Sequence, residues 1–475
     1  MGQYKSFASN TLLLTIGSFS SKVLTFFLVP LYTAILTTEE YGIFDLITTT
    51  VTLLTPFLTL VIAEGVMRFC LDSENYESRD ILSIGIFVVM CGSLVFCALL
   101  PIFNRIDALS QYSLWILVFF VVSNIHLVLT QYLKGINNIK FYTVCGVIST
   151  FLTVILNILF LVIFKWRIIG YMLSYVLAHI LVCILIMAKI NIWRLLKNPL
   201  KINKKTYSDM LKYTVPMIPN SMSWWISNSS DKYFITWLLS TSALGIYSVA
   251  YKIPSLLTII TGIVTSAFQI AAVEDFGSDA SKKFFENMYT LFASFNVSIA
   301  AILILLAKPL AFVLFQKDFF SAWKVTTILV FAYLFNFLAG IIGTVYTSAK
   351  KTTFIFTSTV AGAVINIIFN ALLIKEWGII GAAIATLFSY ICVWLFRVIN
   401  VRKILKFNLH IMVNVVSYII IIFEIIAVLL DSYTGFIVAA ILAVLLLLIN
   451  GIVVYNSELM VGIKQKVHRK IRRTK

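Results

Sequence analysis

Long apolar runs separated by short polar or charged turns fill almost the whole chain. Most are at least as long as the roughly 20 apolar residues that a helix needs to cross a bilayer. The pattern predicts about fourteen spanning helices, near residues 8–34, 42–63, 81–103, 113–133, 141–164, 168–188, 211–239, 243–272, 284–315, 322–348, 353–375, 378–400, 409–430 and 434–455. Most connections are short, so we expect neighbouring helices to be antiparallel.

The composition agrees with a membrane protein. Of the 475 residues, 60% are hydrophobic and 12% are charged, about half the charged share of a soluble domain. The first apolar run, which begins near Ala8, is too long for a signal peptide and is interpreted as the first spanning helix. The sequence therefore predicts an all-α polytopic membrane protein.

The net charge of +17 would suggest nucleic-acid binding in a soluble protein. Here Lys and Arg lie mostly in loops, and they favour the loops on the side of the N-terminus by about four to one. This asymmetry predicts that both termini are cytoplasmic and makes nucleic acid an improbable partner. The basic tail at 464–475 is expected to contact anionic lipid headgroups.

An internal repeat divides the chain at a basic loop. The pattern W-x-I-I-G begins at Trp166 and again at Trp377, and a Gly-Ile pair at Gly42 returns at Gly245. Each pair is separated by an even number of helices, which predicts two parallel six-helix repeats with the substrate site between them. We expect an N-terminal lobe at 1–190, a basic linker at 191–208, a C-terminal lobe at 209–400, and two extra helices with the tail at 401–475.

Motifs of catalysis and cofactor binding are missing from the sequence. It contains no P-loop, no dinucleotide-binding glycine pattern, no HExxH and no G-x-S-x-G. The six cysteines lack metal-type spacing and are interpreted as small core residues. His126 and His179, which lie singly in apolar runs, are interpreted as core residues in preference to a proton relay. We therefore expect a protein that is not an enzyme and needs no cofactor.

Charges inside apolar runs are the most informative positions, because such charges are costly and usually face a cavity or a partner. Asp231 and Lys232 lie in a run rich in serine and asparagine, and Lys252 lies in the next one. At 1.5 Å per residue, both amines are expected roughly 8–9 Å outside the midplane. Lys22 lies near the middle of the first helix.

Two interpretations of these charges remain open. Asp231 could pair with one lysine while the other reaches the headgroups. Alternatively, Lys232 and Lys252, with Lys22 from the other lobe, give a cavity the excess positive charge that attracts an anion. The second interpretation is favoured, with the polar run around Asn228 lining a wet path and Trp225 stacking on sugar rings.

Several motifs together resemble the bacterial polysaccharide repeat-unit flippases (Wzx-type) of the multidrug/oligosaccharidyl-lipid/polysaccharide exporter superfamily. They are Tyr213-x-x-Pro216-x-x-Pro219, Asp231-Lys232, Gly245-x-Tyr247 leading to Lys252, Tyr41-Gly42, Arg68-Phe69 and Lys134-Gly135. The resemblance covers about residues 5–400, and the two extra helices fit longer members of the family.

The resemblance implies alternating access by two lobes in a bacterial cytoplasmic membrane. It implies transfer of undecaprenyl-diphosphate-linked oligosaccharides to the outer leaflet, coupled to a proton or sodium gradient or to the membrane potential. Partners would be membrane lipids and the glycosyltransferases and polymerase of the pathway. Arg68 would receive the diphosphate on entry, or else serve as a positive-inside anchor. A lipid II flippase, a multidrug extruder and a non-transport membrane scaffold or polymerase are the alternatives.

Overall fold

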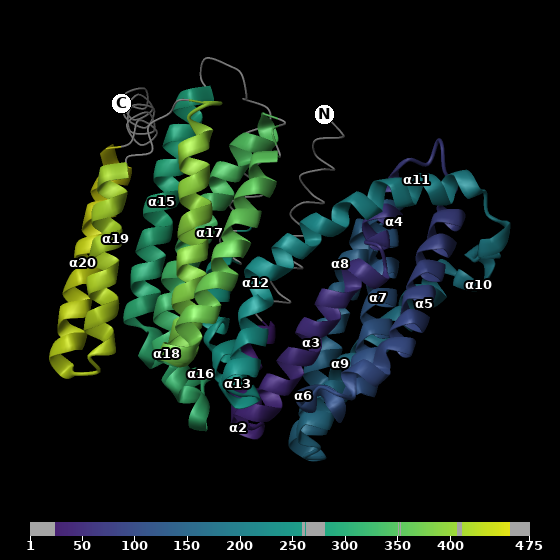
Figure 1. Cartoon of the computed structure of the whole chain (residues 1–475), viewed down its shortest axis with the longest axis horizontal. Coiled ribbons are helices and arrows are strands. Elements are labelled where there is room, and N and C mark those ends of the chain that lie inside the picture. Colours follow the sequence, from purple (N-terminus) through teal and green to yellow (C-terminus); the bar gives the residue numbers. More distant parts are fainter. Residues whose placement is uncertain are drawn as a thin grey trace, which may run out of the picture. The chain divides into compact units, whose positions relative to one another are not determined.

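The computed structural model describes residues 24–258, 262, 281–349, 351, 353–405 and 411–456. This part of the chain is helical nearly throughout and contains no strand, which confirms the all-α class (Figure 1). Ten of its helices are long and apolar enough to cross a membrane. That number is compatible with about fourteen, because residues 1–23 and most of 259–280 lie outside the described part.

Two compact units make up the chain: Met1–Thr236 with Ser240–Gly245, and Trp237–Leu239 with Ile246–Lys475. The first contains α2 (Val29–Ile35), α3 (Thr38–Leu58), α4 (Ile62–Leu71), α5 (Ser78–Phe103), α6 (Asp107–Ser110), α7 (Ser113–Gly135), α8 (Ile139–Asn157), η1 (Ile158–Ile163) and α9 (Arg167–Ile190). It continues with α10 (Ile192–Leu195), η2 (Pro199–Lys201), α11 (Lys204–Thr214), η3 (Val215–Met217), α12 (Ile218–Leu238) and the first half of α13 (Thr241–Ala250).

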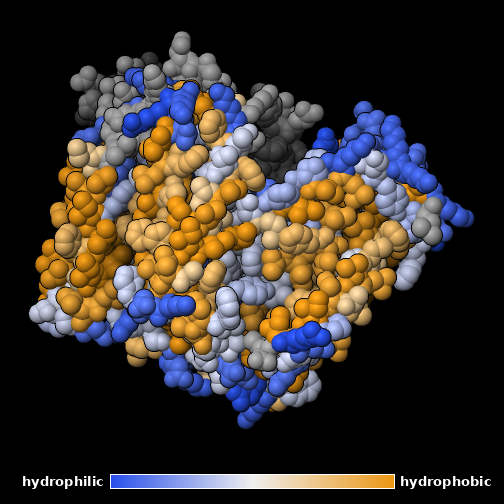
Figure 2. All heavy atoms as spheres, in the orientation of Figure 1, coloured by the Kyte–Doolittle hydropathy of each residue, from blue (hydrophilic) through white to orange (hydrophobic). Residues whose placement is uncertain are grey.

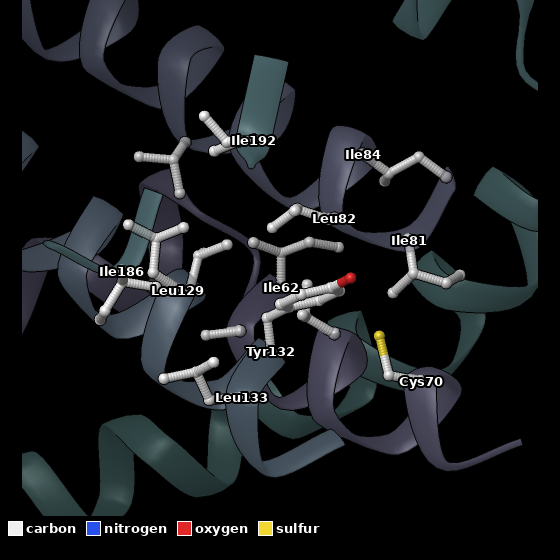
Figure 3. Close-up of a cluster of buried hydrophobic side chains, with 14 of the residues drawn as sticks. Ile62, Cys70, Ile81, Leu82, Ile84, Leu129, Tyr132, Leu133, Ile186 and Ile192 are labelled. Carbon is white, nitrogen blue, oxygen red and sulfur yellow. The ribbon is translucent and has the colours of Figure 1, made fainter. Parts of the chain in front are cut away.

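The core of the first unit lies among α4, α5, α7 and α9. Ile62, Leu82, Leu129 and Ile186 are fully buried there and point toward one another (Figure 3). The same helices expose large apolar side chains on their outer faces, and apolar residues form a broad band over each unit (Figure 2). A surface of this kind is stable when lipid covers it, because apolar side chains then leave water.

Five of the six cysteines lie either in the core or on the outer surface, and Cys392 is half-buried. Cys70, Cys145 and Cys183 are buried, as the sequence predicts, whereas Cys91 and Cys97 lie exposed on α5. The expectation of a core position is therefore wrong for the last two. Both lie on the apolar outer surface of a spanning helix, where a small, weakly polar thiol meets no penalty.

The repeated glycines bring two helices of the first unit very close together. A Cβ added at Gly42 on α3 would lie 1.9 Å from the carbonyl oxygen of Thr241. Reciprocally, a Cβ added at Gly245 on α13 would lie 1.8 Å from the carbonyl oxygen of Thr38. Thr38 lies four residues before Gly42, and Thr241 lies four residues before Gly245. Each glycine therefore packs on the threonine that precedes the other glycine. Contacts of this reciprocal kind are what a two-fold axis produces.

Two predicted helices are interrupted in the structure. The helix predicted at 42–63 ends at Leu58, and α4 begins at Ile62 after Leu60 and Val61 adopt positive φ. The helix predicted at 211–239 is divided by the 3-10 turn η3 at Pro216. Proline lacks an N–H and its ring clashes with the preceding turn, so it favours a helix start over a helix interior.

The second unit contains, besides the end of α13, α15 (Ser281–Leu305), α16 (Ala307–Leu314), η4 (Lys317–Ser321), α17 (Ala322–Ser348), α18 (Thr353–Val401), α19 (Ile411–Leu429) and α20 (Tyr433–Asn456). Helices α19 and α20 lie side by side and both pack against α15 (Figure 1). They are the two extra helices that follow the predicted repeats.

Helix α18 contains the two helices predicted at 353–375 and 378–400. Gly378 has φ 57° and ψ −140° and kinks the helix there. Few residues other than glycine adopt such a conformation. The break between two helices therefore lies where the sequence predicts it.

The compact units do not coincide with the predicted lobes. Helix α12 packs within the first unit, whereas the repeat assigns residues 209–400 to the second lobe. The compact units reflect packing in one conformation, whereas the predicted lobe boundaries rest on the sequence repeat, so the units do not test those boundaries. The lobes at 1–190 and 209–400, the linker at 191–208 and the region at 401–475 therefore stay predictions.

Candidate functional site

Helix α12 buries a polar face within the first unit. Its buried residues are Ser227, Ser230, Asp231 and Ile235, and the spacing of three and four residues places them on one side of a helix. Three of these four side chains are polar. Serine and aspartate lose hydration on burial unless hydrogen bonds replace it, so such a face is expected to find polar partners.

Helix α3 supplies a surface of the same kind. Its threonine hydroxyls at 48, 50, 52, 55 and 59 donate hydrogen bonds to carbonyl oxygens three or four residues earlier on the same helix. This local bonding satisfies the hydroxyls in an apolar environment. It also leaves their oxygens as acceptors for side chains of α12.

Three side chains of α12 contact α3 directly. Lys232 Nζ lies 2.9 Å from Asp45 Oδ2 and 3.1 Å from Oδ1, and it also donates to Thr49 Oγ1 at 3.3 Å. Trp225 Nε1 donates to the Thr49 carbonyl at 3.2 Å. The Tyr233 hydroxyl lies 2.6 Å from Thr50 Oγ1. The two helices are thus joined by one ion pair and a set of hydrogen bonds.

The ion pair between Asp45 and Lys232 is partly buried. Each side chain keeps 19% of its exposure, so each charged group is largely withdrawn from solvent. A pair in this position attracts more strongly than one in bulk water, because the surrounding dielectric is lower. An ion or a polar ligand that reaches it can still compete for either partner.

The structure places Asp231 and Asn228 within α12 itself. Asp231 is 2% exposed, and its Oδ1 accepts a hydrogen bond from the backbone N–H of Lys232 at 2.9 Å. Asn228 Nδ2 donates to the carbonyl oxygen of Trp224 at 2.7 Å. The ring of Trp225 lies 5.7 Å from that of Tyr233. These three predicted site residues and Lys232 therefore lie on one helix segment of the first unit.

The remaining predicted site residues lie elsewhere. Lys252 is half-buried in the helical turns that follow α13 and belongs to the second unit. Its meeting with Lys232 therefore stays a prediction. Lys22 lies outside the described residues. Arg68 is exposed in the last turn of α4, a separate helix and not the end of the predicted 42–63 helix.

Sequence reasoning missed Asp45, the carboxylate that pairs with Lys232. It considered Asp231 as the one nearby carboxylate, yet the partner comes from 187 residues away. A signal was available, because Asp45 is the one charged residue in the apolar run at 42–63. Asp45, Thr49 and Thr52 also lie at helical spacing, which marks a polar face.

The end of the first unit near Arg68 is held by charged and aromatic contacts. The Tyr76 hydroxyl donates to Asp209 Oδ2 at 3.0 Å, and this hydrogen bond raises the pKa of Tyr76. Lys197 of the linker pairs with Glu77 at 2.5 Å and with Asp80 at 2.7 Å. These bonds lower the pKa of Glu77 and raise that of Lys197. Helix α11 and the linker are thereby fixed near the exposed Arg68.

His126 and His179 are brought together, although the sequence suggests separate positions. Their ring centroids lie 4.7 Å apart on α7 and α9, and His179 Nδ1 lies 2.8 Å from the Tyr175 carbonyl oxygen. Both rings are half-buried. Among described residues, His126 Nε2 has no hydrogen-bond partner. Their interpretation as core residues, in preference to a proton relay, stays a prediction.

The chain is similar in sequence to two known protein families and to one archaeal membrane protein. A family model described as polysaccharide biosynthesis protein matches residues 7–273, more than half of the chain. A second one, described as lipid II flippase MurJ, matches residues 234–404. A membrane protein of Methanocaldococcus jannaschii, MJ1068, is 34% identical over 94 residues. That stretch is 20% of this chain and 18% of the relative, so the match spans about a fifth of the relative's length.

Solved structures share the fold over most of the chain. A lipid II flippase MurJ in an inward closed conformation is 17% identical with a TM-score of 0.68, covering 94% of this chain and 99% of its own. An inward-facing multidrug resistance MATE transporter is 12% identical with a TM-score of 0.67, covering 81% and 95%. A transporter from Pyrococcus furiosus is 13% identical with a TM-score of 0.58, covering 84% and 95%.

The fold and the family match together define a multi-pass membrane transporter of the MOP superfamily, the multidrug/oligosaccharidyl-lipid/polysaccharide exporters. This confirms the relationship that the sequence motifs suggest. Within that class, the chain belongs to the polysaccharide biosynthesis protein family.

Proposed function

We propose that the chain is a flippase that moves undecaprenyl-diphosphate-linked oligosaccharides from the cytoplasmic to the outer leaflet of a bacterial cytoplasmic membrane. The observation that carries the proposal is the polar contact between α3 and α12. Membrane helices that face only lipid or an apolar core do not need a buried aspartate, a paired lysine and a row of threonines. A transporter of a diphosphate and sugars does need such groups.

Lys232 is the central residue of the proposed site. Its ammonium is held by Asp45 and Thr49. A diphosphate carries more negative charge than one carboxylate, so it can replace Asp45 as the partner of the amine. Between transport events, Asp45 would pair with the Lys232 amine again and keep it oriented. Lys22 and Lys252 are proposed to add positive charge to the same path.

Sugar residues of the substrate would lie against the aromatic side chains of α12. Trp225 and Tyr233 offer ring faces beside hydroxyls and carbonyls of α3. Rings of this kind stack on sugars, while hydroxyls and asparagine amides such as Asn228 exchange hydrogen bonds with sugar hydroxyl groups. Asp231 is proposed to set the geometry of the amine or to carry a coupling ion.

Entry of the diphosphate is proposed at the cytoplasmic end of the first unit. Arg68 is exposed there beside α11, whose Lys204, Lys205 and Lys212 are also exposed. A basic surface at the membrane boundary attracts phosphate groups. This orientation, with both termini cytoplasmic, rests on the charge asymmetry of the loops.

Complementation of a flippase-deficient strain tests the proposal. We expect Lys232→Ala to lose surface polysaccharide at normal expression and Lys232→Arg to retain part of it, because arginine keeps the charge. Lys375→Ala removes an exposed lysine of the second unit and serves as the matched control. Full surface polysaccharide with Lys232→Ala would refute the binding role of Lys232.

A lipid II flippase is the second candidate, favoured by the MurJ match at residues 234–404. Both candidate substrates carry an undecaprenyl diphosphate, so the cationic site suits either one. Rescue of a strain depleted of its lipid II flippase would favour this alternative. Rescue of surface polysaccharide without rescue of that strain would favour the repeat-unit flippase.

A further inference from the structure

Helix α19 carries one acidic side chain in the interior of the second unit. Glu424 is 0% exposed, and neither carboxylate oxygen has a hydrogen-bond partner among described residues. No other charged residue occurs in α19. The proposed substrate site on α3 and α12 makes no use of it.

The surroundings of Glu424 do not resemble a metal site. The residues one turn away on α19, Ile420, Ile421, Ala427 and Val428, carry no side-chain oxygen. No group of three or more acidic, histidine or cysteine residues that could hold a metal occurs among described residues. Sodium and calcium need several oxygen ligands, whereas a proton needs only the carboxylate itself.

Charged groups of the neighbouring helices are confined to their ends. Helix α19 packs against α15, α17 and α20. Their charged residues are Lys282, Lys283 and Glu286 in the first turns of α15 and Lys324 near the start of α17; α20 has none. The titratable tyrosines are Tyr289 on α15, Tyr333 and Tyr346 on α17, Tyr418 on α19, and Tyr433 and Tyr455 on α20. None of them is a hydrogen-bond partner of Glu424.

An ionised carboxylate in such a place is expensive. Burial of an unpaired charge costs several kcal/mol or more, and a carboxyl group avoids this cost by binding a proton. Glu424 is therefore expected to be a neutral acid in this conformation. A leucine would fill the same space without a polar group, so packing alone does not account for an acid here, and buried acids in spanning helices are typically functional.

A pocket of the second unit begins one helical turn from Glu424 along α19. It has a volume of about 420 Å³ and is lined by Val428, Lys308 and Asp431, among others. Val428 lies one helical turn beyond Glu424, on the same face of α19. Lys308 and Asp431 pair at the rim. In the predicted orientation this end of α19 faces the outside of the cell.

We propose that Glu424 is a proton-binding site of the two extra helices. Its carboxylate takes up one proton from the pocket at Val428 to form the neutral acid, and it releases that proton when a second conformation opens α19 to water. The transport role of this proton rests on the proposed flippase function. The site itself does not, because a buried neutral acid is observable without transport.

Infrared spectroscopy of the full-length protein in lipid nanodiscs tests the site. We expect wild type at neutral pH to show the carbonyl stretch of a protonated carboxylic acid, and Glu424→Gln to lack it. Glu376→Gln, which removes an exposed acid of the same unit, should keep the band. A wild-type spectrum without a band that depends on Glu424 would overturn the proposal. Glu424→Asp should retain a shifted band, which keeps the test valid if the glutamine variant folds poorly.

Proteoliposomes with undecaprenyl-diphosphate-linked radiolabelled galactose test the coupling. A gradient of one pH unit can supply about a tenfold accumulation of substrate per coupled proton, since it is worth about 1.4 kcal/mol. We expect this accumulation with wild type and Glu376→Gln, and none with Glu424→Gln. Tenfold accumulation with Glu424→Gln, or accumulation that follows sodium alone, would overturn the inference. Wild type that moves no substrate would contradict the flippase proposal instead, and the infrared result would still decide whether Glu424 binds a proton.

Discussion

The close contact of α3 with α13 gives a quantitative test of the packing. Replacement of Gly245 by alanine would place a Cβ 1.8 Å from the Thr38 carbonyl oxygen, although real Cβ atoms essentially never lie within 3.0 Å of such an atom. The helices must therefore separate by about 1.2 Å or more, or bend. Overpacking of this kind typically costs about 1–3 kcal/mol.

Alanine has an intrinsic advantage over glycine inside a helix, of about 0.5–1 kcal/mol. The net loss expected for Gly245→Ala is therefore up to about 2.5 kcal/mol, and the melting temperature should fall, by several degrees at the upper end of this range. Gly42→Ala should behave alike, because its Cβ would lie 1.9 Å from the Thr241 carbonyl oxygen. Both variants separate the same helices, so the double variant should cost less than the sum.

Thermal unfolding of the purified protein in detergent measures these losses. Gly146→Ala is the matched control, since no atom of the described residues lies within 4 Å of a Cβ added there on α8. We expect its melting temperature to be unchanged or slightly higher. Equal melting temperatures for Gly245→Ala and Gly146→Ala would refute the packing argument.

Three further outcomes follow from the described contacts. Arg397→Lys should destabilise the second unit by about 1–3 kcal/mol. The buried guanidinium donates to Ser358 Oγ, the Ala339 carbonyl oxygen and Thr359 Oγ1, which one amine cannot reach together. An unchanged melting temperature would contradict this expectation. Gly378→Ala should cost about 1–3 kcal/mol through its positive φ, and thermal unfolding should show it; a variant as stable as wild type would mean that the kink relaxes freely. Lys197→Gln should increase tryptic cleavage of the linker at neutral pH, because it removes the ion pairs with Glu77 and Asp80 that hold the linker to α5. A cleavage rate equal to that of wild type would contradict this role of the ion pairs. The stability that this ion pair gives the linker depends on pH. Glu77, with its lowered pKa, contributes stability above its ordinary pKa of about 4.3 and loses that contribution as the pH falls through its pKa in the folded protein. Lys197, with its raised pKa, contributes stability below its ordinary pKa of about 10.4 and loses that contribution as the pH rises through its pKa in the folded protein.

The spanning helices were predictable because the bilayer imposes a simple rule on sequence. Backbone groups in lipid must bond within a helix, so about 20 apolar residues in a row identify one. Interruptions were predictable only in part. Gly378 lies at the expected break, but the break at Leu60 and Val61 carries no glycine or proline that would have marked it in the sequence.

The candidate site was predictable as a set of residues and not as a set of contacts. Asp231, Lys232, Asn228 and Trp225 stand out by polarity in an apolar run. The partners of Lys232 and Trp225 on α3 are far away in sequence, and only packing decides which of several acids meets Lys232. Asp45 is that partner within the first unit.

Sequence alone determined the class of the protein, because the length of apolar runs, the charge of loops and repeated motifs are local properties. A bilayer requires about 20 apolar residues per spanning helix and favours basic loops on one side. Sequence also marked Gly42 and Gly245 as equivalent. The tertiary structure alone decided that these glycines pack reciprocally, that Asp45 pairs with Lys232 and that Glu424 is buried with no hydrogen-bond partner in the described part of the chain. Those facts depend on distances between helices, which are set by side-chain packing over the whole unit and not by any one segment.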